Sequence, residues 1–369
     1  MLEIAAKDLP TSSGTVQIRP LVEMAVKGLP AMFYPERNLF CYRLNRTSRG
    51  LVKEGISHRY TLMTLLGLDK ARSAGFDSDI DIGAVLADLL RQTDWIDNVG
   101  DLGLYLWTCA VILPESLKNI VASLDLGKTL DGYPDRQRRH TMELAWLLTG
   151  LSYVRLSGQR GLPDLTDLAH EIYQVVKENQ GPGGAFGHLA KNGSSAGRFR
   201  GRIGSFADQV YPIYAFSRFG QAFGVHEALE RATQCANVIC LAQGPLGQWW
   251  WHYDSVTGKL ISKHPVYSVH QEAMGPMALF ALAEATGEDF SRPIFTGLGW
   301  IAGNNELNLD LRDQENHLVW RCFYQSRLKS YSNNLCNLIG LPSSMSGLKV
   351  RYECRPYELG WLLYAFAGR

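Results

Sequence analysis

Apolar residues along most of this chain recur with the three-to-four-residue spacing of a helix, and runs of strict alternation are short. Dense apolar segments that open on polar or aromatic residues alternate with amphipathic segments that carry charges on one side. The pattern therefore predicts a nearly all-helical protein in which buried and half-exposed helices alternate.

Six segments of the dense kind begin near Ser57, Asp101, Arg139, Ser205, Tyr267 and Tyr352. The amphipathic kind covers 84–95, 163–178, 226–242 and 289–302, with weaker candidates at 17–28 and 115–124. Buried helices beside half-exposed ones are what an inner and an outer ring require. We expect one domain over residues 1–369, an all-α, α/α toroid of about six helical hairpins. An irregular helical bundle would produce a similar pattern.

In such a ring all inner helices point the same way, so their N-terminal ends would meet at one mouth. The six polar starts would bring hydroxyl, carboxylate, imidazole and guanidinium groups together there. Arginine side chains and helix N-termini would also favour an anionic group at this end of the ring.

The composition of the chain mainly excludes classes of partner and of binding site. The 369 residues carry 37 Lys plus Arg and 36 Asp plus Glu, so no global charge attracts nucleic acid or an acidic membrane. The sequence has no apolar run long enough to predict a membrane span. The N-terminus lacks the pattern of a signal peptide, so we expect a cytoplasmic protein. The seven cysteines are scattered without a C-x-x-C pair, and nucleotide fingerprints are absent. We expect no metal, no cofactor, and a small-molecule or oligosaccharide substrate.

Two short motifs carry a resemblance. Residues 243–249 read Q-x-x-x-G-x-W, and residues 180–186, one hairpin earlier, read Q-x-x-x-G-x-F. These resemble the QW repeats of the squalene cyclase and prenyltransferase α/α toroids. The resemblance implies that each Gln caps the end of an outer helix and that the aromatic residue stacks over it. The same ring is used by α/α-barrel carbohydrate-active enzymes.

The catalytic signatures of the terpenoid branch are missing. There is no D-x-D-D run, no aspartate-rich diphosphate motif, and no counterpart of the zinc ligands of protein prenyltransferases. Proteins that share a fold can catalyse different reactions, so the function has to be inferred from the residues at the mouth.

Two carboxylates are candidate catalytic groups. Asp208 lies between apolar residues, where desolvation would raise its pKa toward the range of a general acid, although a helix cap is the plainer interpretation. For glycoside hydrolysis we pair Asp208 with Glu272. Lyase or epimerase chemistry would instead move a proton through Tyr211 or His270, with Arg355 holding a substrate carboxylate. The sequence leaves both routes open.

The loop at 249–253 is the candidate binding surface. Three consecutive Trp side chains cannot all point into one core, so at least one should line a cleft and stack on a sugar ring. The residues of this loop are Trp249, Trp250, Trp251, His252 and Tyr253. Further binding candidates are Arg59, Tyr60, Tyr267, Arg355 and Glu358. For the arginines, which precede core helices, a buried ion pair is the structural alternative.

These features favour a carbohydrate-active enzyme that acts on a poly- or oligosaccharide by acid–base catalysis. It would be a glycoside hydrolase, or a lyase or epimerase if the sugar is acidic. The alternative is a terpenoid-cyclase-like enzyme in which Asp208 protonates a polyprenyl substrate. A third possibility is a ring that binds glycans or peptides without catalysis.

Overall fold

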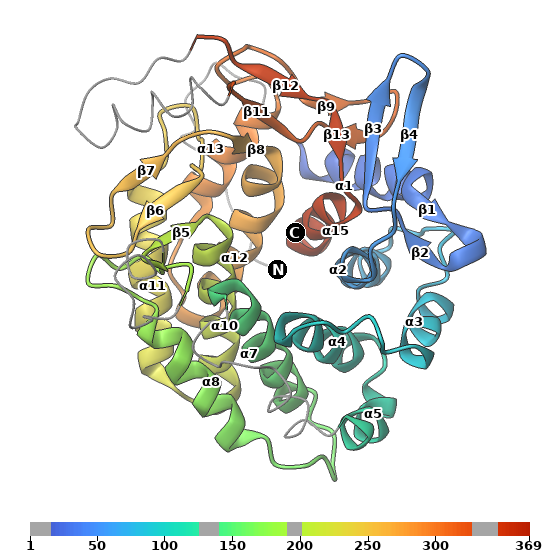
Figure 1. Cartoon of the computed structure of the whole chain (residues 1–369), viewed down its shortest axis with the longest axis vertical. Coiled ribbons are helices and arrows are strands. Elements are labelled where there is room, and N and C mark those ends of the chain that lie inside the picture. The colour runs from blue at the N-terminus through green and yellow to red at the C-terminus, as the bar shows by residue number, and fades with distance from the viewer. Residues whose placement is uncertain (1–15, 125–139, 190–200, 327–345) are drawn as a thin grey trace.

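Six helices form an inner ring in the computed structural model, which describes residues 16–124, 140–189, 201–326 and 346–369 (Figure 1). They are α2 (His58–Ser73), α4 (Val99–Ile112), α7 (Thr141–Leu156), α10 (Ala207–Phe223), α12 (Gly275–Thr286) and α15 (Pro356–Phe366). A π-helical turn, His270–Met274, leads into α12. Each inner helix matches one predicted segment; the expected start at Arg139 lies outside the described residues, and α7 begins at Thr141.

The outer helices are α1 (Ile18–Gly28), α3 (Ile82–Arg91), α5 (Leu117–Ser123), α8 (Thr166–Glu178), α11 (His226–Leu241) and α13 (Ser291–Ile301). The two classes differ in burial as the sequence predicts. In α4 every residue from Val99 to Ala110 is buried, whereas α8 buries only four residues spaced along one face. The α/α-toroid prediction is therefore confirmed. No helix in the described ranges is long and apolar enough to cross a membrane.

The inner helices pack on one another in chain order, and α15 packs on α2 to close the ring. Glycines permit the closest approaches. A Cβ on Gly67 of α2 would lie 2.0 Å from the carbonyl oxygen of Gly360 in α15. A Cβ on Gly150 of α7 would lie 2.4 Å from the carbonyl oxygen of Gly103 in α4. Any side chain at these positions would therefore force the two helices apart.

Aromatic side chains fill the middle of the ring. Trp107 is fully buried, and its ring stacks on Tyr153, Tyr214 and Trp361 at centroid distances of 5.5, 5.1 and 5.3 Å. Beyond it, the hydroxyls of Tyr153, Tyr214 and Tyr364 lie 2.7 to 2.9 Å from one another. The middle of the helix ring therefore holds packed aromatic side chains. The polar starts of the inner helices lie at the end of the helix ring that is opposite the three tyrosine hydroxyls.

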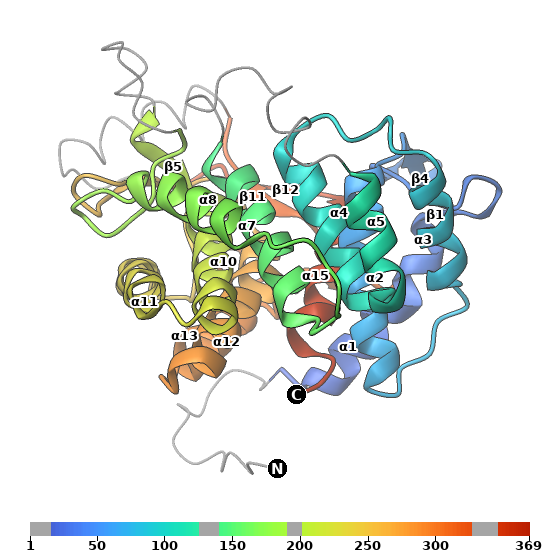
Figure 2. The same ribbon diagram turned by 90° about the horizontal axis from the view of Figure 1, so that it is seen from below.

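That opposite end is called the mouth here; it is formed by residues 57–60, 98–101, 140–143, 205–208, 267–270 and 352–358. Short antiparallel strands gather on this side of the molecule (Figure 2). They form the sheets β13–β3–β4 (Glu353–Cys354, Arg43–Thr47, Gly50–Glu54), β5–β6–β7 (Ile203–Ser205, His252–Asp254, Leu260–Ser262), β12–β11–β8 (Lys349–Arg351, Cys322–Tyr324, Val266–Tyr267), β1–β2 (Phe33–Tyr34, Leu39–Phe40) and β10–β9 (Leu318–Val319, Arg312–Asp313).

These strands are the main departure from a nearly all-helical prediction. Each has five residues or fewer, too short for the alternation of burial to stand out in the sequence. Four of them, β4, β5, β8 and β13, end within a few residues of the start of an inner helix. The sheets therefore help to fix where the polar helix starts lie.

The two QW-like motifs have the same local geometry. The Gln180 side chain donates to the carbonyl oxygens of Gly184 (2.9 Å) and Arg231 in α11 (3.0 Å). The Gln243 side chain donates to Gly247 (3.0 Å) and Pro293 in α13 (2.9 Å). Each glutamine therefore ties the loop after one outer helix to the next outer helix.

Both motifs depend on the other two residues of the pattern as well. Gly184 and Gly247 have φ of +84° and +95°, which favours glycine, and Phe186 and Trp249 are fully buried. The motif is thus an architectural element of this ring.

Loss of one such tie should cost stability. Gln180→Ala leaves one buried and one partly buried carbonyl oxygen without this donor, so we expect the free energy of unfolding to fall by about 1–3 kcal/mol in urea denaturation. Gln174→Ala, at an exposed position of α8, is the matched control and should change stability little. Equal stability of the two variants would show that the glutamine tie contributes nothing.

Candidate active site

Three adjacent inner helices each place a carboxyl group in their first turn at the mouth. Asp101 lies on α4, Glu143 on α7 and Asp208 on α10. Because α4 packs on α7 and α7 packs on α10, the three side chains belong to one side of the ring. First-turn carboxylates are also stabilised by the helix dipole.

Asp101 is held in an ion pair. It accepts from Arg59 Nε at 2.7 Å and from Asn98 Nδ2 at 3.0 Å, and its side chain is 5% exposed. The Arg59 guanidinium lies over the ring of Trp146, 5.3 Å from its centroid. Arg59 is therefore fixed from two sides and still partly exposed, as a ligand-contacting residue needs to be.

A pocket of about 260 Å³ opens beside this ion pair. Trp95 stacks on His58 at 5.5 Å, and Tyr42 stacks on Tyr60 at 5.5 Å. The pocket is lined by Tyr42, Ile56, Ser57, His58, Arg59, Tyr60, Trp95, Asp97 and Asp101. It therefore combines aromatic faces with charged hydrogen-bonding groups, a composition suited to sugars.

Glu143 is half-buried against α4, where a Cβ on Gly100 would lie 3.0 Å from the Glu143 Cβ. Burial raises the pKa of Glu143 above its ordinary range; His140 and Arg59 act against this shift, and Asp101 adds to it. A carboxyl that keeps its proton at higher pH while remaining accessible meets the requirement for a general acid.

Asp208 is almost wholly buried, at 1% exposure, and does not open onto solvent. Its Oδ2 accepts from the backbone N and the Oγ of Ser205, both at 2.8 Å, and lies 3.0 Å from His188 Nδ1. The His188 side chain is 36% exposed. The structure thus places Asp208 behind His188.

Two further histidines belong to this group. The His140 ring lies 4.5 Å from the His188 ring, and His252 pairs with Ser205 across β5 and β6. Burial lowers the pKa of His252 to about 4, and the neighbouring Asp208 only partly offsets this. His252 is therefore neutral near pH 7.

The aromatic loop divides into buried and accessible residues. Trp249 and Tyr253 are fully buried and Trp250 is 4% exposed, with its Nε1 donating to Ala242 O at 2.9 Å. Trp251 and His252 are partly exposed, and their rings lie 5.0 Å apart. Trp251 is therefore the tryptophan of this run that is available to a ligand, whereas Tyr253 does not reach the mouth.

All four predicted catalytic residues are buried, His270, Tyr211 and Glu272 as well as Asp208. His270 is 3% exposed between Phe206 (4.5 Å) and Trp251 (5.9 Å), and burial lowers its pKa to about 3. Tyr211 is 3% exposed and accepts from Trp361 Nε1 at 3.0 Å, below the mouth.

Glu272 is fully buried, and neither of its oxygens has a hydrogen-bond partner among the described residues. Burial raises the pKa of Glu272 well above its ordinary range, and Glu358 shifts it in the same direction. Among the described residues, Asp208 hydrogen-bonds Ser205 and His188, and no hydrogen bond joins it to Glu272.

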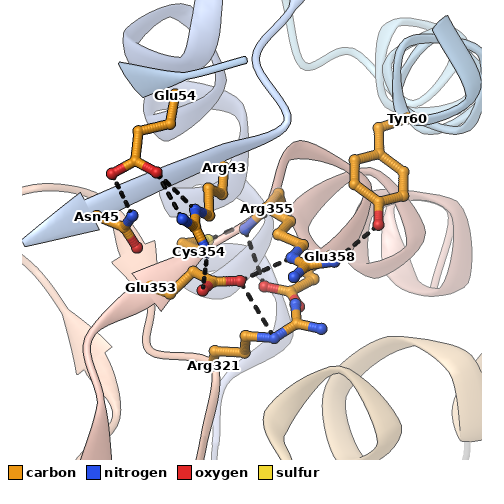
Figure 3. A network of polar contacts seen from close by, with 9 residues as sticks. All are labelled: Arg43, Asn45, Glu54, Tyr60, Arg321, Glu353, Cys354, Arg355 and Glu358. Atoms are coloured by element: carbon orange, nitrogen blue, oxygen red, sulfur yellow. Dashed lines mark hydrogen bonds and ion pairs between the residues drawn. The ribbon is translucent and has the colours of Figure 1, made fainter. Parts of the chain in front are cut away.

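The remaining arginine candidate, Arg355, belongs to a buried ion-pair network that also contains Arg321 (Figure 3). Arg355 Nε donates to Glu353 at 2.7 Å and Arg355 Nη1 donates to the Tyr60 hydroxyl at 2.8 Å. Arg321 pairs with Glu353 and with Glu358, which also accepts from the backbone N of Arg355.

This network holds aromatic residues at the rim of the mouth. The Arg355 guanidinium lies over Tyr42 and that of Arg321 over Tyr267, 4.5 and 4.9 Å from the ring centroids. Arg355 therefore takes the structural alternative that the sequence allowed, a buried ion pair, and Glu358 caps α15. Together with Arg321, they position Tyr60, Tyr42 and Tyr267.

Sequence reasoning missed His188, which sits in a glycine-rich loop, and assigned no role to Glu143 or Asp101. One signal was available for His188, because it follows Phe186 of one QW-like motif as Trp251 follows Trp249 of the other. Within the described ranges no group of three His, Cys, Asp or Glu side chains could hold a metal ion.

No protein-family model matches this chain, and no curated protein matches it in sequence. Solved structures do match. An unsaturated glucuronyl hydrolase from a Bacillus species is 16% identical, with 95% of this chain and 94% of that chain covered and a TM-score of 0.61. An inactive variant of an α-1,6-mannanase from a Salegentibacter species, in complex with α-1,6-mannotetrose, is 14% identical, with coverage of 96% and 99% and a TM-score of 0.60.

A third structure is an unsaturated glucuronyl hydrolase specific for heparin, 12% identical over 95% of both chains, with a TM-score of 0.59. At these identities the likeness shows the fold, which is the α/α toroid of these enzymes. No QW-repeat or terpenoid-cyclase relationship emerges from these matches.

The buried Glu272 yields a pH test of the fold. Its raised pKa means that the folded protein holds a proton that the unfolded chain releases above its ordinary carboxyl pKa of about 4.3. Its contribution to stability is thus present at low pH and is lost as pH rises. Glu272→Gln does not titrate, so its free energy of unfolding should rise relative to wild type between pH 5 and pH 8 in chemical denaturation.

The matched control is Glu230→Gln at an exposed position of α11, whose difference from wild type should not change with pH. A Glu272→Gln protein that loses stability relative to wild type as pH rises would show that the ionised carboxylate is the stabilised form.

Proposed function

We propose that this protein hydrolyses a glycosidic bond of an oligosaccharide at the mouth of the ring, with Glu143 as the general acid. The observation that carries the proposal is the position of Glu143. It is a half-buried carboxyl with a raised pKa, next to the Arg59–Asp101 ion pair and to His140. Hydrolysis needs an acid that protonates the leaving oxygen, and Asp101 supplies a second carboxylate nearby.

The binding surfaces on either side of Glu143 support a sugar ligand. On the α2 and α4 side is the 260 Å³ pocket with Trp95 and Tyr42 in its walls. On the α10 and α12 side is the partly exposed Trp251. Aromatic faces bury the C–H faces of sugar rings while the charged groups select hydroxyls, so an oligosaccharide would span the mouth.

The arginines favour hydrolysis over lyase or epimerase chemistry. In the described part of the mouth Arg59, Arg321 and Arg355 are each paired with a protein carboxylate. The route through a substrate carboxylate held by Arg355 therefore has less support. The structural neighbours named above include hydrolases of both glucuronyl and mannose substrates, which agrees with the proposal.

The terpenoid-cyclase-like alternative has no such support. A polyprenyl substrate needs an apolar cavity inside the ring, and that space is filled by Trp107 and the aromatic rings packed on it. Asp208, the expected proton donor to an alkene, is bonded to Ser205 and His188 and is 1% exposed.

The role of Glu143 can be tested by Glu143→Gln, which keeps the shape of the side chain and removes the acid. We expect turnover to fall by about 10²–10⁴-fold, the usual contribution of a general acid, with the Michaelis constant little changed. The assay panel contains α-1,6-mannotetraose and heparin oligosaccharides that end in an unsaturated glucuronyl unit.

Glu178→Gln, at an exposed position of the outer helix α8, is the control and should retain full activity. Full turnover by Glu143→Gln would overturn the assignment. Calorimetric binding of a sugar by wild type without any turnover would show instead a glycan-binding ring.

Trp251 should contribute binding energy rather than chemistry. Trp251→Ala removes a partly buried aromatic surface, so we expect weaker oligosaccharide binding by about 1–3 kcal/mol in calorimetry and a similar rise in the Michaelis constant. Trp251→Phe keeps an aromatic face and should recover most of the affinity. Unchanged affinity in Trp251→Ala would place the sugar elsewhere at the mouth.

A further inference from the structure

A second pair of glutamines makes the two consecutive hairpins around the QW-like motifs comparable residue by residue. Gln209 in α10 accepts from the backbone N of Phe186 (2.7 Å) and donates to its carbonyl oxygen (2.9 Å). Gln271 accepts from the backbone N of Trp249 (3.0 Å) and donates to its carbonyl oxygen (3.3 Å).

The correspondence extends beyond the aromatic residue. Gln209 also donates to the carbonyl oxygen of Ser205, four residues before it, and Gln271 to that of Tyr267, again four residues before it. In both hairpins, therefore, the side chain of a glutamine at the start of the inner helix forms two hydrogen bonds with the backbone of the buried aromatic residue. This fixes the residues around it in the same register.

The residues at corresponding positions of this framework differ between the two hairpins. The residue two positions after the buried aromatic residue is His188 in the first hairpin and Trp251 in the second. The residue directly before the glutamine is Asp208 in the first hairpin and His270 in the second. In the second hairpin Trp251 stacks on His270, with the rings 5.9 Å apart and 9° from parallel. In the first hairpin the same two positions hold a hydrogen-bonded His–Asp pair at 3.0 Å.

The His–Asp pair has the construction of an acid–base dyad. Asp208 is fixed by two bonds from Ser205 and is buried behind the imidazole. With Nδ1 of His188 directed to Asp208, any proton exchange with a substrate takes place at Nε2. The His188 side chain is 36% exposed and its ring lies 4.5 Å from His140, beside Glu143.

We propose that His188 is a catalytic residue that takes the proton of the attacking water, and that Asp208 is its positioning residue. This inference rests on the proposed hydrolysis. The water oxygen forms a bond to the anomeric carbon while its proton passes to His188 Nε2. The bond between that carbon and the leaving oxygen breaks with its electron pair on the oxygen, which takes the proton of Glu143. Afterwards His188 is an imidazolium and Glu143 a carboxylate, and solvent returns one proton from the first to the second.

The test compares wild type with His188→Ala, Asp208→Asn and the double variant, on the sugar of the panel that wild type hydrolyses fastest. For His188→Ala we expect kcat to fall by about 10²-fold or more, with KM little changed. Added imidazole should restore part of the rate, which a purely structural histidine would not allow. Because Asp208 acts through His188, the double variant should be no slower than His188→Ala alone.

His226→Ala, at an exposed position of the outer helix α11, is the matched control and should be unaffected by imidazole. If His188→Ala does not fold, His188→Gln takes its place in the same comparison.

The outcomes separate this inference from the proposed function. If wild type hydrolyses a sugar and Glu143→Gln is inactive, but His188→Ala keeps its rate, the dyad is overturned and the proposed function stands. A slow His188→Ala that imidazole does not restore, with additive effects of the two single variants, also overturns the dyad. If wild type hydrolyses no member of the panel, or Glu143→Gln retains full turnover, the proposed function fails first and this inference fails with it.

Discussion

The closure of the inner ring by α15 against α2 is the contact on which the rest of the structure depends. It joins the last helix of the chain to the first inner helix through Gly67 and Gly360, whose backbones approach too closely for any side chain. Because an outer helix returns the chain between each inner helix and the next, the six inner helices run the same way and their N-terminal ends meet at one mouth. The ion-pair network of Arg321 and Arg355 braces that seam from the mouth side, because it links α15 to Tyr60 of α2.

The ring separates two environments with different chemistry. Its middle is packed with aromatic rings around Trp107, and beyond them three tyrosine hydroxyls satisfy one another. Water is therefore excluded from the lower side of the mouth, and the groups there are desolvated to different degrees. Glu272 and His270, fully enclosed, are driven to their neutral forms. Glu143 is only half enclosed, so it can hold a proton and still meet a ligand.

Much of this arrangement could be predicted from the sequence. A polar start followed by a dense apolar run marks an inner helix, because a helix surrounded by other helices must be apolar on most sides while its start faces the mouth. The QW-like motifs mark two loops with the same geometry, but each glutamine donates to its own loop and to the next outer helix instead of capping the helix before it.

The details of the site could not be predicted in the same way. Whether Trp250 or Trp251 opens to the ligand depends on the register of β6 against β5, which the sequence does not reveal. His188 lies in a loop without periodicity, and its place is fixed by Gln209, which binds Phe186 from 23 residues away. Asp208 and Glu272 looked equivalent as carboxylates among apolar residues. Only the packing shows that Asp208 hydrogen-bonds a histidine, whereas Glu272 is enclosed with no hydrogen-bond partner in the part of the chain that the structure describes.

The central claim is that the mouth between Trp95 and Trp251 holds an oligosaccharide over Glu143. A crystal structure of the Glu143→Gln protein soaked with the sugar that wild type hydrolyses would test it most directly. The account predicts one sugar ring against Trp251, another in the pocket beside Arg59, and a glycosidic oxygen within hydrogen-bonding distance of residue 143. A sugar bound away from the mouth, or one whose glycosidic oxygens all lie out of reach of residue 143, would contradict it.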